Sequence, residues 1–368
     1  MGKAMTPDER MRLLVRLCAI ERDGYPLPDL ESGEVDALAR EAEREGVAGW
    51  LTHRLTESYD DWRPRDELRL KLRAAAIGTV AHNARILCVA KILTEKLDGI
   101  ETILLKGAAL IDSPYYKDLS HRLAGDIDLW VAPDRLMEAR ERLLEAGATV
   151  EAYDGPQVGD EDAHLPPMKY EGVILELHGR LFYKKMGWDP PEPLGSYATE
   201  WHGRRMLRPD AMAHHLVMHA YKHYVRMKVG LRWVVDLAVV MASADDARGL
   251  LSLCKSSTPE AEKAIKWAMG VALPLMPKAT AKEMEDLGYK PIEFARNRSK
   301  GVSTGMAKRW AIERIIEKAV ANAARAKGVR GKIRAIVTSI KYETGRTRAR
   351  YPDDCLLTGL VKRIFFRK

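Results

Sequence analysis

The chain has 368 residues, a length that suggests two or three domains, and a net charge of +8. Its composition, 46% hydrophobic and 30% charged, is typical of a globular protein. No stretch approaches the roughly 18 consecutive apolar residues of a membrane-spanning helix, and residues 1–16 lack the long apolar segment of a secretory signal. The four cysteines lie far apart without Cys-x-x-Cys spacing, which excludes a disulfide framework or a cysteine zinc site and indicates a cytoplasmic protein.

Residues 1–98 are expected to form an N-terminal helical segment. Apolar residues from Val35 to Ala42 and from Val47 to Leu55 follow helical spacing on either side of Gly46. Residues 66–97 are rich in Leu, Ala, Lys and Arg, all strong helix formers, and predict one long helix.

The pattern changes at Ile100, where short apolar runs of β type begin to alternate with helical stretches. Asp134 is a plausible helix N-cap, and Gly147 is a plausible stop for the same helix. This alternation predicts an α/β or α+β core over residues 99–205. The expected elements are strands at 102–105, 126–131, 148–153 and 173–178, and helices after Gly107 and from Pro133 to Glu145.

The C-terminal third is expected to be helical, with a domain over residues 206–300 and a basic region over residues 301–368. Residues 291–368 hold 20 Lys and Arg against 6 Asp and Glu, a local balance of +14, whereas the other 290 residues have a balance of −6. Such a segment is either a set of solvated helices or a surface for an anionic partner, such as nucleic acid, polyphosphate or a lipid headgroup.

Three carboxylates stand out on the apolar runs of the predicted core. Asp126 and Asp128 are two residues apart in one expected strand and therefore share a face, and Glu176 lies in another. Converging buried carboxylates are costly unless a positive charge compensates them. Oxygen ligands of this kind select hard cations such as Mg²⁺, so the sequence favours metal-assisted phosphoryl chemistry.

Five motifs follow one another along the chain, namely Leu105-Lys106-Gly107, Arg122 to Leu129, Glu176 to His178, His219, and Arg232 to Leu237. Their order resembles that of the polymerase-β-like nucleotidyltransferase superfamily and, more narrowly, of a bacterial branch of uncharacterised nucleotidyltransferases. The resemblance implies a small mixed sheet with helices, embedded in helical flanking segments. It also implies transfer of NMP from an NTP, most simply ATP, to a hydroxyl or phosphate acceptor.

Two Mg²⁺ ions fit this chemistry, because they can clamp the attacking and the leaving oxygens of an in-line displacement. Asp126 and Asp128 are expected to bridge both ions, and Glu176 to complete the ion near the acceptor. Either Glu176 or a metal-bound hydroxide then takes the proton of the acceptor.

Five further residues are expected to bind the nucleotide. Lys106 and Arg122 supply positive charge to its phosphates, and Gly107 permits close approach of the backbone. His178 shares the carboxylate face, and His219 is expected to line the nucleotide cleft. The familiar Gly-Ser or Gly-Gly turn of the superfamily is replaced here by Gly107 followed by alanine.

Several alternatives stay open from the sequence. Arg122 is equally a structural ion-pair partner of Asp118 or Asp126, and His178 is about as often a satisfied core histidine. The chain as a whole is alternatively a catalytically degenerate nucleotide- or RNA-binding protein. A third interpretation is a zinc hydrolase that uses the cluster of His214, His215, His219 and His223, the last three helically spaced, although its general-base motif is absent. The acceptor is a small molecule, a peptide or RNA, and the loop 154–164 is expected to frame its pocket.

Overall fold

A computed structural model describes residues 5–151, 164–182, 184, 187–225, 229–244, 246–253 and 258–295. All of them lie in one compact unit of the chain. The predicted basic helices of residues 301–368 lie outside the described residues, as does the predicted acceptor loop apart from His164.

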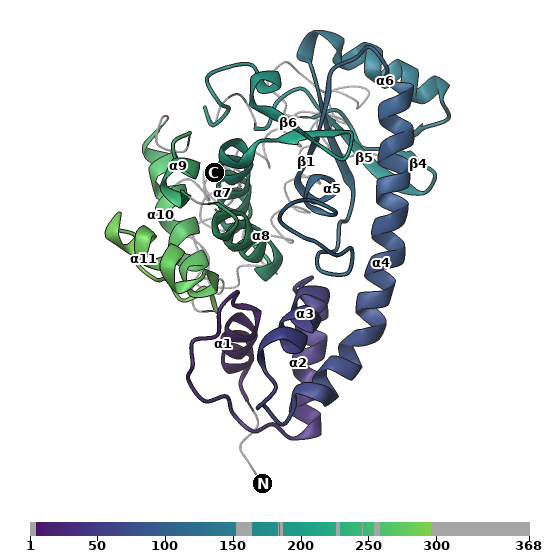
Figure 1. The fold of residues 1–368 in the computed structure, drawn as a ribbon. Helices are drawn as coiled ribbons and strands as arrows, with labels where there is room; N and C mark the ends of the chain where they lie inside the picture. The colour runs from purple at the N-terminus through teal and green to yellow at the C-terminus, as the bar shows by residue number, and fades with distance from the viewer. Residues whose placement is uncertain are drawn as a thin grey trace, which may run out of the picture. The chain divides into compact units, whose positions relative to one another are not determined.

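Four helices precede the sheet, and the last three match the helical stretches predicted from the sequence. A capping box fixes the start of the first, because the Thr6 hydroxyl accepts from the Glu9 backbone and the Glu9 carboxylate accepts from the Thr6 backbone. The fourth helix confirms the long helix predicted over residues 66–97; it contacts α2 and α3 towards one end and α5 and α6 towards the other (Figure 1). The four are α1 Pro7–Cys18, α2 Ser32–Arg44, α3 Ala48–Ser58 and α4 Arg65–Lys96.

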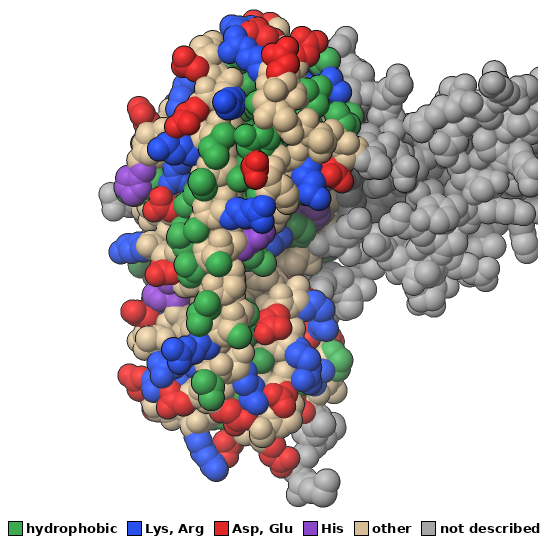
Figure 2. Space-filling model, turned by 90° about the vertical axis from the view of Figure 1, so that its right-hand side faces the viewer, with side chains coloured by type: hydrophobic (Ala, Val, Ile, Leu, Met, Phe, Trp, Pro, Cys, Tyr) green, Lys and Arg blue, Asp and Glu red, His purple; other side chains and the backbone are tan. Residues whose placement is uncertain are grey.

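One long side of α4 faces outward. Hydrophobic side chains run along this face of the molecule in the space-filling view (Figure 2). Three hydrophobic residues of α4 are exposed, namely Leu70, Ile77 and Val80. Among the described helices, α4 is the one that is long and apolar enough to cross a membrane. Core helices of water-soluble proteins meet the same criterion of length and composition. The expectation that no segment spans a membrane stays a prediction.

A mixed seven-stranded sheet forms the centre of the described structure and bears out the α+β fold class expected from the sequence. Its strand order is β3-β4-β5-β2-β1-β7-β6. Two neighbouring pairs are parallel, β2 with β5 and β1 with β7, and the remaining pairs are antiparallel. The strands are β1 Thr102–Leu105, β2 Ile127–Val131, β3 Thr149–Val150, β4 Met168–Tyr170, β5 Val173–His178, β6 Ala198–Trp201 and β7 Arg204–Leu207.

The central strands β2 and β5 position the acidic motif. Every residue of β2 is buried, so the sheet is covered on both faces at this point. The structure confirms the predicted strands at 102–105 and 173–178, whereas β2 begins at Ile127 and leaves Asp126 just before it.

Two helices lie between the first strands and the middle of the sheet. The short α5, Lys106–Leu110, follows β1 directly, and α6, Leu136–Glu145, follows a 3-10 turn at Pro133–Arg135. The prediction of Asp134 as an N-cap was wrong, because Ala132 and Arg135 hold the two cap positions and neither caps with its side chain. Gly147 was predicted correctly as the stop, since its φ of 101° is the left-handed conformation that glycine tolerates.

The hairpin of β6 and β7 was missed by the sequence interpretation. Its two strands are short and carry charged residues, so they lack the apolar runs used to find the others. His202 and Gly203 form its turn with φ values of 47° and 72°, as a two-residue hairpin turn requires. Because β7 pairs with β1, the sheet extends past the predicted boundary at residue 205; the domain boundaries stay predictions.

Helices follow the sheet, as expected for residues 206–300. The longest is α7, which contacts α8, α9, α10 and strand β7. Short 3-10 turns also occur at Leu194–Tyr197 and Leu273–Leu275. The helices are α7 Pro209–Val225, α8 Leu231–Ala242, α9 Ala247–Leu250, α10 Pro259–Ala272 and α11 Lys278–Asp286.

Candidate active site

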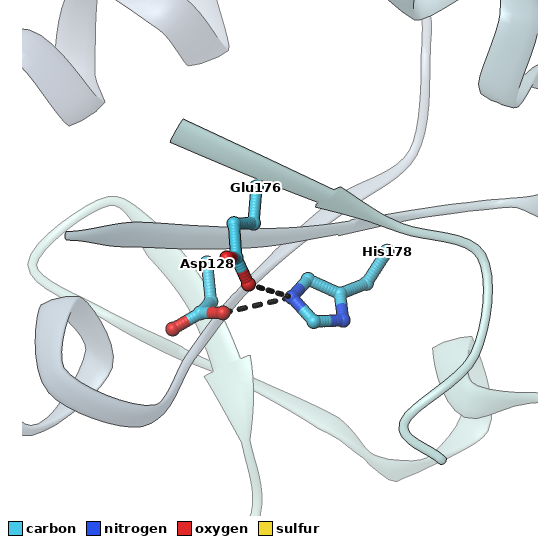
Figure 3. A group of neighbouring side chains, drawn as sticks. All are labelled: Asp128, Glu176 and His178. Atoms are coloured by element: carbon cyan, nitrogen blue, oxygen red, sulfur yellow. Dashed lines mark hydrogen bonds and ion pairs between the residues drawn. The ribbon is translucent and has the colours of Figure 1, made fainter. Parts of the chain in front are cut away.

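The parallel pairing of β2 with β5 brings two of the predicted carboxylates side by side. Asp128 and Glu176 are direct partners in the register of the two strands. His178 is two residues beyond Glu176, so its side chain projects from the same face of the sheet. Figure 3 shows the three side chains converging, with the imidazole directed at both carboxylates.

His178 joins the two carboxylates through a single ring nitrogen. Its Nε2 lies 2.7 Å from Oδ1 of Asp128 and 3.6 Å from Oε2 of Glu176. The short contact requires a proton on Nε2, because a carboxylate oxygen can only accept. Ligand atoms of the three residues lie within 4.8 Å of one another, the one such group found among the described residues.

Asp128 is the most buried member of the group, with a side chain 1% exposed. Its Oδ1 also accepts from Nζ of Lys106, the residue that joins β1 to α5. Burial works against the charge of this carboxyl, but Lys106 and His178 hold its pKa well below the usual range. Its other oxygen, Oδ2, has no hydrogen-bond partner in the part of the chain that the structure describes.

Lys106 supplies the positive charge at this point. Burial opposes that charge, yet the carboxylates, Asp128 first and Glu176 second, raise the pKa of the ammonium above its usual value. Glu176 itself is less enclosed, with a side chain 22% exposed. Burial disfavours its ionisation, but the interaction with His178 lowers its pKa overall.

Asp126 lies just before β2 and outside the three-residue group. It is nevertheless close enough to interact electrostatically with the group. Burial, together with the negative charge of Asp128, raises the pKa of Asp126 to about 6. The paired acidic residues of the motif therefore occupy different environments. Asp128 is held ionised by partners, and Asp126 takes up a proton readily when no cation is bound.

These residues fit a divalent cation. Two ionised carboxylates are adjacent, and Oδ2 of Asp128 is a buried acceptor without a partner among the described residues, which a cation would satisfy. Carboxylate oxygens are the ligands that hard cations such as Mg²⁺ prefer.

Arg122 was predicted to bind phosphate or to pair with Asp118 or Asp126, and its partner is a different residue. Its guanidinium donates to both oxygens of Asp236 on α8, with the shortest contact 3.0 Å from Nη2 to Oδ2. Both side chains are buried. The Tyr116 hydroxyl donates to the same carboxylate at 2.9 Å. Arg122 thus fastens the loop before β2 to α8, and its role towards a nucleotide stays a prediction.

Gly107 provides room for that arginine. A Cβ at this position would lie 2.3 Å from Nη1 of Arg122. The sequence interpretation reserved this space for a nucleotide phosphate, whereas in the structure it accommodates the guanidinium. Nucleotide binding by Gly107 stays a prediction as well.

His219 lies on α7 within an aromatic group. Its ring meets Trp233 edge-on, with centroids 5.5 Å apart, and lies 4.5 Å from that of His223. Burial lowers the pKa of His219 well below its usual value. His215, one turn earlier, is also buried and neutral, and the charge of Lys106 acts on both rings. Nucleotide binding by His219 stays a prediction.

The zinc-hydrolase alternative gains no support from these histidines. Among the described residues, the one group of three or more metal-ligating side chains is Asp128, Glu176 and His178, and it contains no α7 histidine.

Asn83 on α4 is a site-supporting residue that the sequence interpretation missed. Its side-chain amide donates to the carbonyls of Leu119 and Arg122 at 2.7 and 2.6 Å, and its carbonyl accepts from Ala124 at 3.1 Å. It therefore fixes the loop that leads into Asp126. The available signal was a polar residue on the buried, helically spaced stripe of α4.

Comparison with known proteins agrees with the geometry. A family model described as uncharacterised nucleotidyltransferase matches residues 31–265, well over half of the 368 residues. All candidate site residues named above lie within that range. No curated protein and no solved structure matches the chain.

Proposed function

This chain belongs to the uncharacterised nucleotidyltransferase family, and on that premise we propose that it transfers NMP from an NTP, most simply ATP, to a hydroxyl or phosphate acceptor. Membership makes it a transferase of phosphorus-containing groups, with a nucleotide as substrate. The observation that carries the proposal is the register pairing of Asp128 with Glu176, which puts two carboxylates side by side. The order of the motifs further supports the polymerase-β-like superfamily.

We assign the metal-binding role to Asp126, Asp128 and Glu176, with two Mg²⁺ ions as the proposed complement. When bound, such ions neutralise the charge of the attacking and the leaving oxygens. The assignment is supported by Oδ2 of buried Asp128, which has no hydrogen-bond partner among the described residues. The negative charge of a triphosphate requires more than one cation nearby. Several carboxylates are needed to hold these cations, so Asp126 and Glu176 are assigned together with Asp128.

Three side chains of the site have further proposed roles in the reaction. Glu176 is the more exposed carboxylate of the adjacent pair, which suits it to accept the proton of the acceptor hydroxyl. His178 holds the two carboxylates in position through its Nε2 proton. Lys106, whose side chain is 17% exposed, provides a positive charge for the phosphates.

Nucleotide binding tests the proposal without knowledge of the acceptor. We expect the purified chain to bind a non-cleavable ATP analogue in calorimetry with Mg²⁺, and to bind it at least about tenfold more weakly as the Asp128→Asn variant. Asp134→Asn is the matched control, because it makes the same chemical change at an exposed carboxylate on the surface. Equal affinity in Asp128→Asn and in the control would rule the site out.

The basic segment 291–368 favours a second candidate function, nucleotide or RNA binding without turnover. Its balance of +14 predicts RNA affinity that falls steeply with salt, since each phosphate contact releases counterions. Salt-dependent RNA binding that persists in Asp126→Asn, together with no release of pyrophosphate in any acceptor mixture, would favour this candidate over nucleotidyl transfer.

A further inference from the structure

Lys106 occupies the position of a cation in the carboxylate group. Its Nζ donates to Oδ1 of Asp128, the same oxygen that Nε2 of His178 contacts at 2.7 Å. Two nitrogen donors therefore converge on one oxygen atom of one buried carboxylate. Positive charge at this point is required, because Asp128 is 1% exposed and a buried carboxylate without compensation is unstable.

The backbone of Lys106 is held in an uncommon conformation that directs this contact. Its φ is 47°, the left-handed region that residues with a Cβ seldom adopt. Lys106 directly follows β1 as the first residue of α5 and precedes Gly107, whose own Cβ position is taken up by Arg122. A strained non-glycine residue in this place is explained by a role for its side chain.

A divalent cation and the Lys106 ammonium compete for Asp128. Both are positive, and two positive charges on one carboxylate repel each other strongly where water is excluded. The ammonium of Lys106 lies at the end of a flexible four-carbon side chain that is partly exposed, so it can move away from Asp128. The incoming nucleotide brings a polyphosphate, which offers the ammonium new acceptor oxygens.

We propose that Lys106 is a displaceable counter-ion, which neutralises Asp128 before substrate binds and transfers to a polyphosphate oxygen when the divalent cation arrives. The inference rests on the nucleotidyl transfer proposed above for the identity of the anion. The competition for Asp128 rests only on the geometry.

The consequence is coupling between metal and nucleotide. A divalent cation alone must displace the ammonium into solvent and therefore binds weakly. The same cation with a polyphosphate binds more tightly, because the displaced ammonium gains a partner. Neutralising Lys106 removes the competitor, so metal affinity alone rises by about tenfold, while the coupling to ATP is lost.

Calorimetric titration of the full chain with Mn²⁺ tests this inference, with ATP absent and then present. It is carried out at pH 8, so that protons do not compete for the carboxylates. Lys106→Met removes the charge, and Lys106→Gly does so while also relieving the left-handed backbone. Lys106→Arg keeps a charge, and Lys169→Met is the control at an exposed lysine of β4. Lys106→Arg, which keeps the competing charge, should not gain Mn²⁺ affinity, and the control should behave as the natural chain does.

Tighter Mn²⁺ binding by Lys106→Met or Lys106→Gly, with ATP no longer improving it, is the expected result. Unchanged or weaker Mn²⁺ binding in the folded variants would overturn the inference and make the ion pair structural. If the natural chain binds no ATP with Mn²⁺, the proposed function fails, while the titration without ATP still decides whether Lys106 competes for the metal site.

Discussion

Two aspartates separated by one residue behave differently at this site. Asp128 is enclosed and keeps its charge because Lys106 and His178 contact it. Asp126 precedes the strand, and burial together with the charge of Asp128 raises its pKa to about 6. A carboxyl with a raised pKa is protonated more readily, and a protonated carboxyl binds a cation poorly.

Metal affinity should therefore depend on pH in a defined window. As the pH rises through about 6, Asp126 loses its proton in the metal-free chain and Mn²⁺ binding strengthens; below that value a proton competes and affinity falls up to tenfold for each pH unit. Titration with Mn²⁺ between pH 5 and 8 measures this. Asp126→Asn should flatten the change near pH 6. An unaltered inflection in that variant would assign the titration to another group.

Asn83 shows what one buried amide contributes. It satisfies two carbonyls and one backbone N–H of the loop 119–124. Asn83→Leu leaves those groups without their partner, and we expect a loss of about 3 kcal/mol in the free energy of unfolding. Urea unfolding measures it, with His82→Leu, an exposed neighbour on the same helix, as the control. Similar stability of the two variants would contradict the role assigned to Asn83.

The sequence predicted the spatial neighbours of some candidate site residues but not of others. Apolar alternation, a local property, predicted the strands that carry Asp128 and Glu176, whereas their adjacency depends on the pairing of β2 with β5, which is a tertiary property that the resemblance implied. The partner of Arg122 was not predicted, because Asp236 is more than a hundred positions further along the chain and only tertiary packing brings them together. Ion-pair partners at such separation leave no periodic signal.

At the scale of elements, close contact between helix α3 and the loop before β2 depends on one glycine. A Cβ at Gly49 would lie 1.7 Å from the carbonyl oxygen of Ser120. Backbone atoms cannot yield as a flexible side chain can, so α3 would have to move. The loop that Asn83 fixes from α4 is thus also enclosed by α3.

Two alanine substitutions separate packing from helix propensity. Gly49→Ala should destabilise the fold by about 2 kcal/mol or more, because the helix must shift to admit the methyl group. Gly78→Ala on α4 meets nothing within 4 Å and should stabilise it by about 0.5–1 kcal/mol, since alanine favours helix. Thermal unfolding of both variants measures the difference. Equal shifts would show that α3 does not approach the loop this closely.

Elements with an apolar period were predictable, and those without one were not. The long α4 and the strands β1 and β5 match their predicted ranges closely, because burial imposes a period of 3.6 or 2 on the sequence. The β6–β7 hairpin lies at the edge of the sheet and follows no such period. Only its His202-Gly203 turn carried a local signal.

At the scale of the whole molecule, three separated segments supply the site. Lys106 directly follows β1, Asp128 lies on β2 and Glu176 on β5, and the sheet order β5-β2-β1 makes these strands neighbours. Helices α4 and α8 hold the intervening loop through Asn83 and Asp236. The reaction type follows from this assembly and the family, whereas no motif in the sequence specifies the acceptor.

The central claim is that this assembly transfers a nucleoside monophosphate. Incubation of the chain with Mg²⁺, a cell extract as the source of acceptors, and ATP labelled at either the α or the γ phosphate tests it most directly. Beyond the labelling seen in extract without the chain, label from the α phosphate should enter an acceptor and label from the γ phosphate should not, with this transfer lost in Asp128→Asn and kept in Asp134→Asn. Incorporation of the γ phosphate alone, or equal incorporation of the α phosphate by Asp128→Asn, would contradict the account.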